Sequence, residues 1–79
     1  MAEKIHYLLF RDQGAASAAE ERLRRYGSVR IDADTDEEGP YQLVILSTTV
    51  EESLPDDELE ALAQEFGGEY DASETELEA

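Results

Sequence analysis

Apolar residues are spaced as in strands in some segments of this chain and as in helices in others. The order of these segments constrains the fold more than any other feature. Strands are predicted in three segments: residues 4–10, which carry apolar residues on both sides, residues 28–33, in which apolar and polar residues alternate, and residues 41–50, which contain the longest apolar run. A spacing of three and four, which indicates helices, occurs in two segments: residues 13–26, with Asp12 as the expected cap, and residues 55–66, with Ser53 as the expected cap. Gly67 or Gly68 ends the second helix, and residues 69–72 are expected to add a short last strand.

The order strand, helix, strand, strand, helix, short strand is that of the ferredoxin-like fold. This is an α+β sandwich with the split βαββαβ pattern, in which both helices cover one face of an antiparallel sheet. In the first strand, His6, Leu8 and Phe10 share one side, which we assign to the open face. An open face with apolar residues is a candidate surface for a homodimer or another partner. The alternative is that the tail or a loop covers it.

The 79 residues suffice for one small domain, which we place at residues 1–72. Residues 73–79 are acidic and weakly apolar, so we expect a frayed C-terminal tail. The chain has no cysteine, which excludes disulfides and thiolate metal sites and fits a reducing cytosol. The longest apolar run, residues 43–46, is too short to span a membrane, and the first residues lack the layout of a signal peptide. We therefore expect a soluble, cytoplasmic protein without membrane contact.

The net charge is −15, from 21 acidic and 6 basic residues, and no Lys or Arg follows Arg30. Low lysine with abundant carboxylates is similar to proteins of salt-loving microbes. There, concentrated salt shortens the Debye length to about 3 Å at 1 M and screens the self-repulsion. The other interpretation is that the acidic part of the chain attracts a basic partner.

Direct nucleic-acid binding is disfavoured, because phosphates require clusters of Lys and Arg. The one cluster in the sequence is Arg22, Arg24 and Arg25. Glu20 and Glu21 precede two of these arginines by four residues, a spacing that favours ion pairs on a helix.

Asp32, Asp34 and Asp36 match the first three ligand positions of a calcium-binding loop. The rest of the loop does not match, because Glu37 stands where Gly is needed and Leu43 where a bidentate Glu is needed. We interpret this segment as a solvated turn.

His6 is the only histidine, and no Cys or second His could complete a zinc site with it. We expect a half-exposed strand residue. Ser47, Thr48 and Thr49 have no activating base near them in the sequence. The glycine pair ends a helix instead of opening one, so it does not predict a phosphate loop. The sequence predicts no enzyme, no cofactor and no metal.

Residues 62–71 resemble the C-terminal signature of the RraB family, the regulators of ribonuclease E activity B. In that family a helix ends in a glycine pair followed by Tyr-Asp-Gly-Trp. Four residues match the pattern: Gly67, Gly68, Tyr70 and Asp71. Ala72 and Ser73 stand where the family has its Gly and Trp. The layout of residues 5–71 is similar too. The resemblance implies a ferredoxin-like fold and a protein that binds and inhibits the endoribonuclease that starts bacterial mRNA decay.

Charge and resemblance together favour a non-catalytic protein-interaction module that regulates RNA turnover by binding a ribonuclease with a basic surface. The candidate partner-binding residues are Asp56, Asp57, Glu60, Gly68, Tyr70 and Asp71. For Tyr70 and Asp71 the alternative is structural, with Tyr70 packed over Phe66 and Asp71 capping a turn. Three other functions stay open: an acidic nucleic-acid mimic, a small-ligand sensor, and a small domain whose charge reflects halophilic adaptation.

Overall fold

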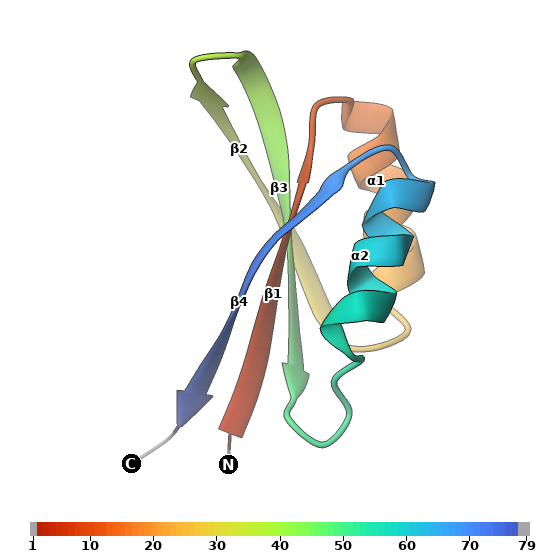
Figure 1. Ribbon diagram of the computed structural model, residues 1–79, viewed down its shortest axis with the longest axis vertical. Coiled ribbons are helices and arrows are strands. Elements are labelled where there is room, and N and C mark those ends of the chain that lie inside the picture. Colours follow the sequence, from red (N-terminus) through yellow and green to blue (C-terminus); the bar gives the residue numbers. More distant parts are fainter. Residues whose placement is uncertain (1, 78–79) are drawn as a thin grey trace.

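The computed structural model describes residues 2–77 and has the ferredoxin-like split βαββαβ arrangement (Figure 1). The elements follow in this order: β1 (Ala2–Phe10), α1 (Gln13–Leu23), β2 (Ser28–Asp36), β3 (Gly39–Thr49), α2 (Asp56–Glu65) and β4 (Glu69–Leu77). The predicted order and type of all six elements are confirmed. Their bounds differ most for β2, which is longer than predicted at its end, and for β4.

The four strands form one antiparallel sheet in the order β2-β3-β1-β4. Both helices lie on the same side of it (Figure 1). Residues that pair across neighbouring strands point to the same face of a sheet. Leu8 pairs with Val44, and Val44 pairs with Ile31, so these three side chains share the helix-covered face.

The core lies between the sheet and the two helices. Its buried members are Leu8, Phe10, Ala16, Ala19, Leu23, Val44, Leu46, Leu59, Leu62 and Ala63. The small residues Ala16 and Ala19 are fully buried, which lets α1 lie close to the sheet. Asp12 caps α1 through a hydrogen bond from the Ala15 amide at 2.9 Å, which confirms the predicted cap.

The assignment of the two faces of β1 from the sequence is wrong. His6, Leu8 and Phe10 are fully buried beneath the helices, and His6 is not half-exposed. The open face carries instead the partly buried Ile5, Tyr7 and Leu9 of β1. Their cross-strand neighbours Leu43 and Ile45 of β3 belong to it as well. Because β1 is apolar on both sides, its alternation alone could not identify the inner side.

The expected C-terminal tail is wrong for residues 73–77. β4 continues to Leu77, and Ser73, Glu74 and Thr75 pair with β1 residues, as do the two positions after them. The register shifts between Tyr7 and Leu8, which leaves Asp71 as the extra residue of a β-bulge. Residues 78–79 of the expected tail lie outside the described residues.

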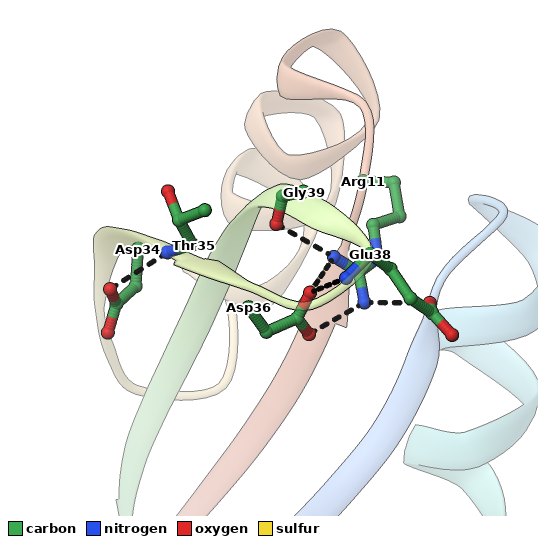
Figure 2. A network of polar contacts seen from close by, with 6 residues as sticks. All are labelled: Arg11, Asp34, Thr35, Asp36, Glu38 and Gly39. Carbon is green, nitrogen blue, oxygen red and sulfur yellow. Dashed lines mark hydrogen bonds and ion pairs between the residues drawn. The ribbon is translucent and has the colours of Figure 1, made fainter.

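The β2–β3 hairpin is held at its tip by Arg11, which directly follows β1 (Figure 2). Its guanidinium donates to both carboxylate oxygens of Asp36, at 2.9 and 2.8 Å. It also donates to Glu38 Oε2 at 3.1 Å and to the Gly39 carbonyl at 3.2 Å. Gly39 has φ +118°, a backbone conformation that favours glycine. An ion-pair network therefore connects the tip of the hairpin to a residue outside it.

Candidate functional site

The six predicted partner-binding residues lie on α2, on β4 and in the turn between them. Asp56, Asp57 and Glu60 are exposed on α2, and Asp71 is exposed on β4. Asp56 and Glu60 are four residues apart and share one face of the helix. We call these four carboxylates the acidic surface. Gly68 does not belong to it, because this glycine packs against Phe10 and the carbonyl of Leu9 in the interior.

Tyr70 joins the acidic surface to the core. Its ring packs against the core cluster, as does that of Phe66, so the packing alternative is favoured for this residue. Its hydroxyl donates a hydrogen bond of 3.1 Å to Asp56 Oδ1. Burial raises the pKa of the Tyr70 phenol, so the hydroxyl keeps the proton that it donates. Asp56 is thereby held at the start of α2, next to β4.

A buried histidine lies beneath this pair. His6 Nδ1 is 2.9 Å from the Tyr70 hydroxyl, and His6 Nε2 is 2.7 Å from Ser53 Oγ. The side chain of His6 is 0% exposed, and its Nδ1 lies 3.8 Å from Asp56 Oδ1. Ser53 was the predicted cap of α2, but the helix begins after Pro55 without a side-chain cap. Ser53 points to His6 instead.

The hydrogen bonds of this network fit a neutral imidazole with its proton on Nδ1. That N–H donates to the Tyr70 oxygen, and Nε2 accepts from the Ser53 hydroxyl. The Ser53 hydroxyl also has the Leu54 carbonyl within 3.2 Å, so it can turn and accept from a protonated Nε2. Burial lowers the pKa of His6, which the Asp56 carboxylate partly opposes by raising it, while Lys4 lowers it further.

Ser53, His6 and Asp56 are the residue types of a nucleophile, a base and an orienting acid. The geometry differs from that of a catalytic triad, because Tyr70 takes the hydrogen bond from Nδ1 that the acid would receive. The fully buried His6 also leaves a substrate no access to Nε2. The arrangement can tie the loop before α2 to β1 and β4, and it can respond to a proton.

The arginine ion pairs lie away from the acidic surface. Among the described residues, Arg11 pairs with Asp36 and Glu38, Arg24 with Glu20, and Arg30 with Asp32. The predicted pair of Arg24 and Glu20 is thus confirmed, at 3.4 Å. Within residues 2–77, no ion pair joins an arginine to a carboxylate of α2 or β4. The acidic surface is left uncompensated.

Asp32, Asp34 and Asp36 lie on strand β2 and not in a loop. Arg11 binds Asp36 through both carboxylate oxygens, and the hydrogen bond from Arg11 lowers the pKa of Asp36. In the part of the chain that the structure describes, no three His, Cys, Asp or Glu side chains are grouped to hold a metal ion. None of the helices in that part is long and apolar enough to cross a membrane.

The sequence interpretation missed the network of His6, Ser53, Tyr70 and Asp56. Ser53 and Tyr70, which contact His6 directly, are 47 and 64 residues from it along the chain, so no local spacing connects them. One feature of the sequence could have indicated that His6 is buried. It occupies every second position of the strand together with Leu8 and Phe10, so the three side chains share one face of β1. A polar residue on a buried face needs hydrogen-bond partners.

Comparison with protein-family models, with curated proteins and with solved structures found no match to this chain. The resemblance to the ribonuclease regulators therefore depends on Gly67, Gly68, Tyr70 and Asp71 and on the layout of the elements.

Proposed function

We propose that this protein is a non-catalytic interaction module that binds a basic protein partner through its acidic surface. The observation that carries the proposal is the exposed, uncompensated set of Asp56, Asp57, Glu60 and Asp71 on two neighbouring elements. Carboxylates of this kind raise the rate of encounter with a positive surface and make binding sensitive to salt.

One member of the surface is held in place before a partner arrives. Asp56 accepts the hydrogen bond of Tyr70, and Tyr70 is fixed in turn by His6 and by the core. A side chain that is already ordered loses less entropy on binding. The carboxylate of Asp56 is still 54% exposed, so it can meet a lysine or arginine of the partner.

The partner class that we propose is a ribonuclease whose RNA-binding surface is basic, so that docking would regulate RNA turnover. The support is the match of Gly67, Gly68, Tyr70 and Asp71 to the family pattern, together with the charge. We propose no direct binding of nucleic acid, because a negative surface repels phosphates.

The structure offers less support for nucleic-acid mimicry. A mimic needs carboxylates in ordered rows, and Asp32, Asp34 and Asp36 form such a row on β2. Arg30 lies 3.9 Å from Asp32, and Arg11 binds Asp36, so this row is largely neutralised. Halophilic adaptation remains as the alternative explanation of the charge.

The test is an RNA-cleavage assay with the host's ribonuclease, run with excess protein and followed by a binding measurement. We expect slower cleavage, and we expect the double variant Asp57→Lys, Glu60→Lys to lose the effect. The matched control is Glu21→Lys, Glu37→Lys, which makes the same change of charge at exposed sites on α1 and in the hairpin. Unchanged cleavage would overturn the ribonuclease as partner. Equal loss of binding in both double variants would overturn the acidic surface as the docking site.

A further inference from the structure

A buried proton-binding group lies directly behind the acidic surface. The imidazole of His6 is 0% exposed, and its Nδ1 is 2.9 Å from the Tyr70 hydroxyl. The same hydroxyl donates to Asp56 Oδ1 at 3.1 Å, and the side chain of Asp56 is 54% exposed. Tyr70 therefore connects a ring that no partner can contact to a carboxylate that a partner can contact.

We propose that a proton on His6 and a basic partner on Asp56 oppose each other, so that proton uptake inside the fold weakens binding at the acidic surface. The inference rests on the proposed function, because it concerns the regulation of the same surface. Coupling between two sites is reciprocal. A partner that binds Asp56 therefore promotes the release of a proton from His6.

The native arrangement can accept this proton without losing a hydrogen bond. A protonated imidazole donates from both nitrogens. Nδ1 keeps its bond to the Tyr70 oxygen, and Nε2 donates to Ser53 Oγ, which is 2.7 Å away. The Ser53 hydroxyl then turns its own proton to the Leu54 carbonyl, at 3.2 Å. The charged ring is thus compatible with the folded loop before α2.

Among the described residues, the charged side chains that act on His6 are Asp56 of α2 and Lys4 of β1. Burial lowers the pKa of His6, the Asp56 carboxylate raises it, and Lys4 lowers it further. Asp56 Oδ1 is 3.8 Å from Nδ1. The neighbours of the ring from the other elements carry no charge at neutral pH: Leu46 of β3, Ser73 and Tyr70 of β4, and Ser53 of the loop. Asp56 is therefore the group that favours the protonated ring.

Asp56 cannot serve two cations at full strength. When His6 is charged, it compensates part of the negative charge of Asp56 from inside, and a lysine or arginine of the partner is attracted less. When a cation of the partner pairs with Asp56, the imidazolium loses the attraction that favours it and gives up its proton. Acidification therefore weakens the surface while the carboxylate stays in place.

The coupling is tested first without a partner, by NMR titration of the His6 ring in the full chain from about pH 8 to 4.5. His6 is the only histidine, so its ring signals are assigned directly. Asp56→Asn keeps an oxygen that accepts from Tyr70 but removes the charge, so the pKa of His6 should fall. Asp57→Asn removes the same charge at the neighbouring exposed position and should shift the pKa of His6 much less. Equal shifts in the two variants, or a ring that stays neutral until the chain unfolds, would overturn the inference.

An oligolysine peptide is the probe for the acidic surface. Its dissociation constant should be about fivefold higher at pH 5 than at pH 7.5, and a saturating amount of the peptide should lower the pKa of His6. His6→Gln cannot take up the proton and should lose most of the difference between the two pH values. Circular dichroism checks its fold, and the titration of the native chain with and without peptide remains as the test if this variant is unfolded.

Equal affinity of the native chain at the two pH values would overturn the inference. Absence of peptide binding at both would overturn it too, because nothing would then compete with the charged ring. The proposed function fails in a different way. If the ribonuclease is unaffected while the peptide affinity and the pKa of His6 change as expected, the partner class is wrong and the proton coupling holds. If the ribonuclease is inhibited equally at both pH values, the function holds and the coupling is overturned.

Discussion

At Gly68, one added methyl group would test the packing of the α2–β4 turn on the sheet. A Cβ atom at this position would enter the space of the Phe10 ring and lie 2.6 Å from the carbonyl oxygen of Leu9. Ordinary van der Waals contact begins at 3.4 Å, so the oxygen and the methyl group would have to separate by several tenths of an ångström. Phe10 is fully buried, and Leu9 is paired with strands on both sides. Neither neighbour can move freely.

We therefore expect Gly68→Ala to lower the free energy of unfolding by about 2–3 kcal/mol, in the upper part of the range for overpacked cores. In a chain of this size that loss corresponds to a fall of roughly 10–20 °C in the midpoint of thermal unfolding. Urea unfolding followed by circular dichroism measures the change. Gly14→Ala is the control, since its Cβ meets only the Asp12 side chain, at 3.2 Å, and alanine favours a helix.

A second variant identifies the cause of the loss. Phe10→Leu removes part of the ring that the methyl group would meet, so Gly68→Ala should cost less in the Phe10→Leu background than in the native chain. The reasoning would be refuted if Gly68→Ala changed stability by no more than the Gly14→Ala control. In that case the glycine would be free to serve a partner, as the sequence resemblance implies.

Three further predictions concern the polar groups. Burial lowers the pKa of His6 below its usual value near 6.5, so the unfolded chain binds more protons than the folded chain near that pH. The free energy of unfolding should therefore fall as the pH drops through 6.5. Urea unfolding from about pH 7.5 to 5.5 measures this pH dependence, which His6→Gln should abolish. Arg11→Lys should speed amide hydrogen exchange at Glu38 and Gly39, because lysine cannot bind Asp36 through two nitrogens, and exchange at Leu46 should stay unchanged. The midpoint of thermal unfolding should rise between about 0.1 M and 1 M KCl, since screening weakens the repulsion within a chain of charge −15, and an unchanged midpoint would contradict this.

The sequence predicted the fold where apolar residues repeat over many positions. Residues 41–50 contain the longest apolar run of the chain, and the structure has β3 there. The sequence did not predict which face of β1 is inside, because Ile5, Tyr7 and Leu9 on the open face are as apolar as the residues on the buried face. The inner face is decided by contacts with β3 and the helices, which are far from β1 in the sequence.

The last strand shows a second limit. Ser73, Glu74 and Thr75 have no apolar alternation, so their sequence favours a tail. They form a strand because the edge of β1 offers backbone hydrogen-bonding groups that need partners. The hydrogen bonds of His6 to Ser53 and Tyr70 could not be predicted for a related reason. They join residues that only the packed fold brings together.

Ionic strength should act in opposite directions on the proposed binding and on the stability of the fold. Binding of a basic partner to the acidic surface weakens as salt screens the attraction, whereas a chain of charge −15 gains stability as salt screens the repulsion within it. An acidic binding module would therefore be folded and bind its partner at about 0.1 M KCl, whereas a salt-adapted domain would reach its full stability only near 1 M KCl, where the attraction of its carboxylates is largely screened. Measuring partner binding and thermal unfolding across one KCl series therefore separates the two interpretations of the charge.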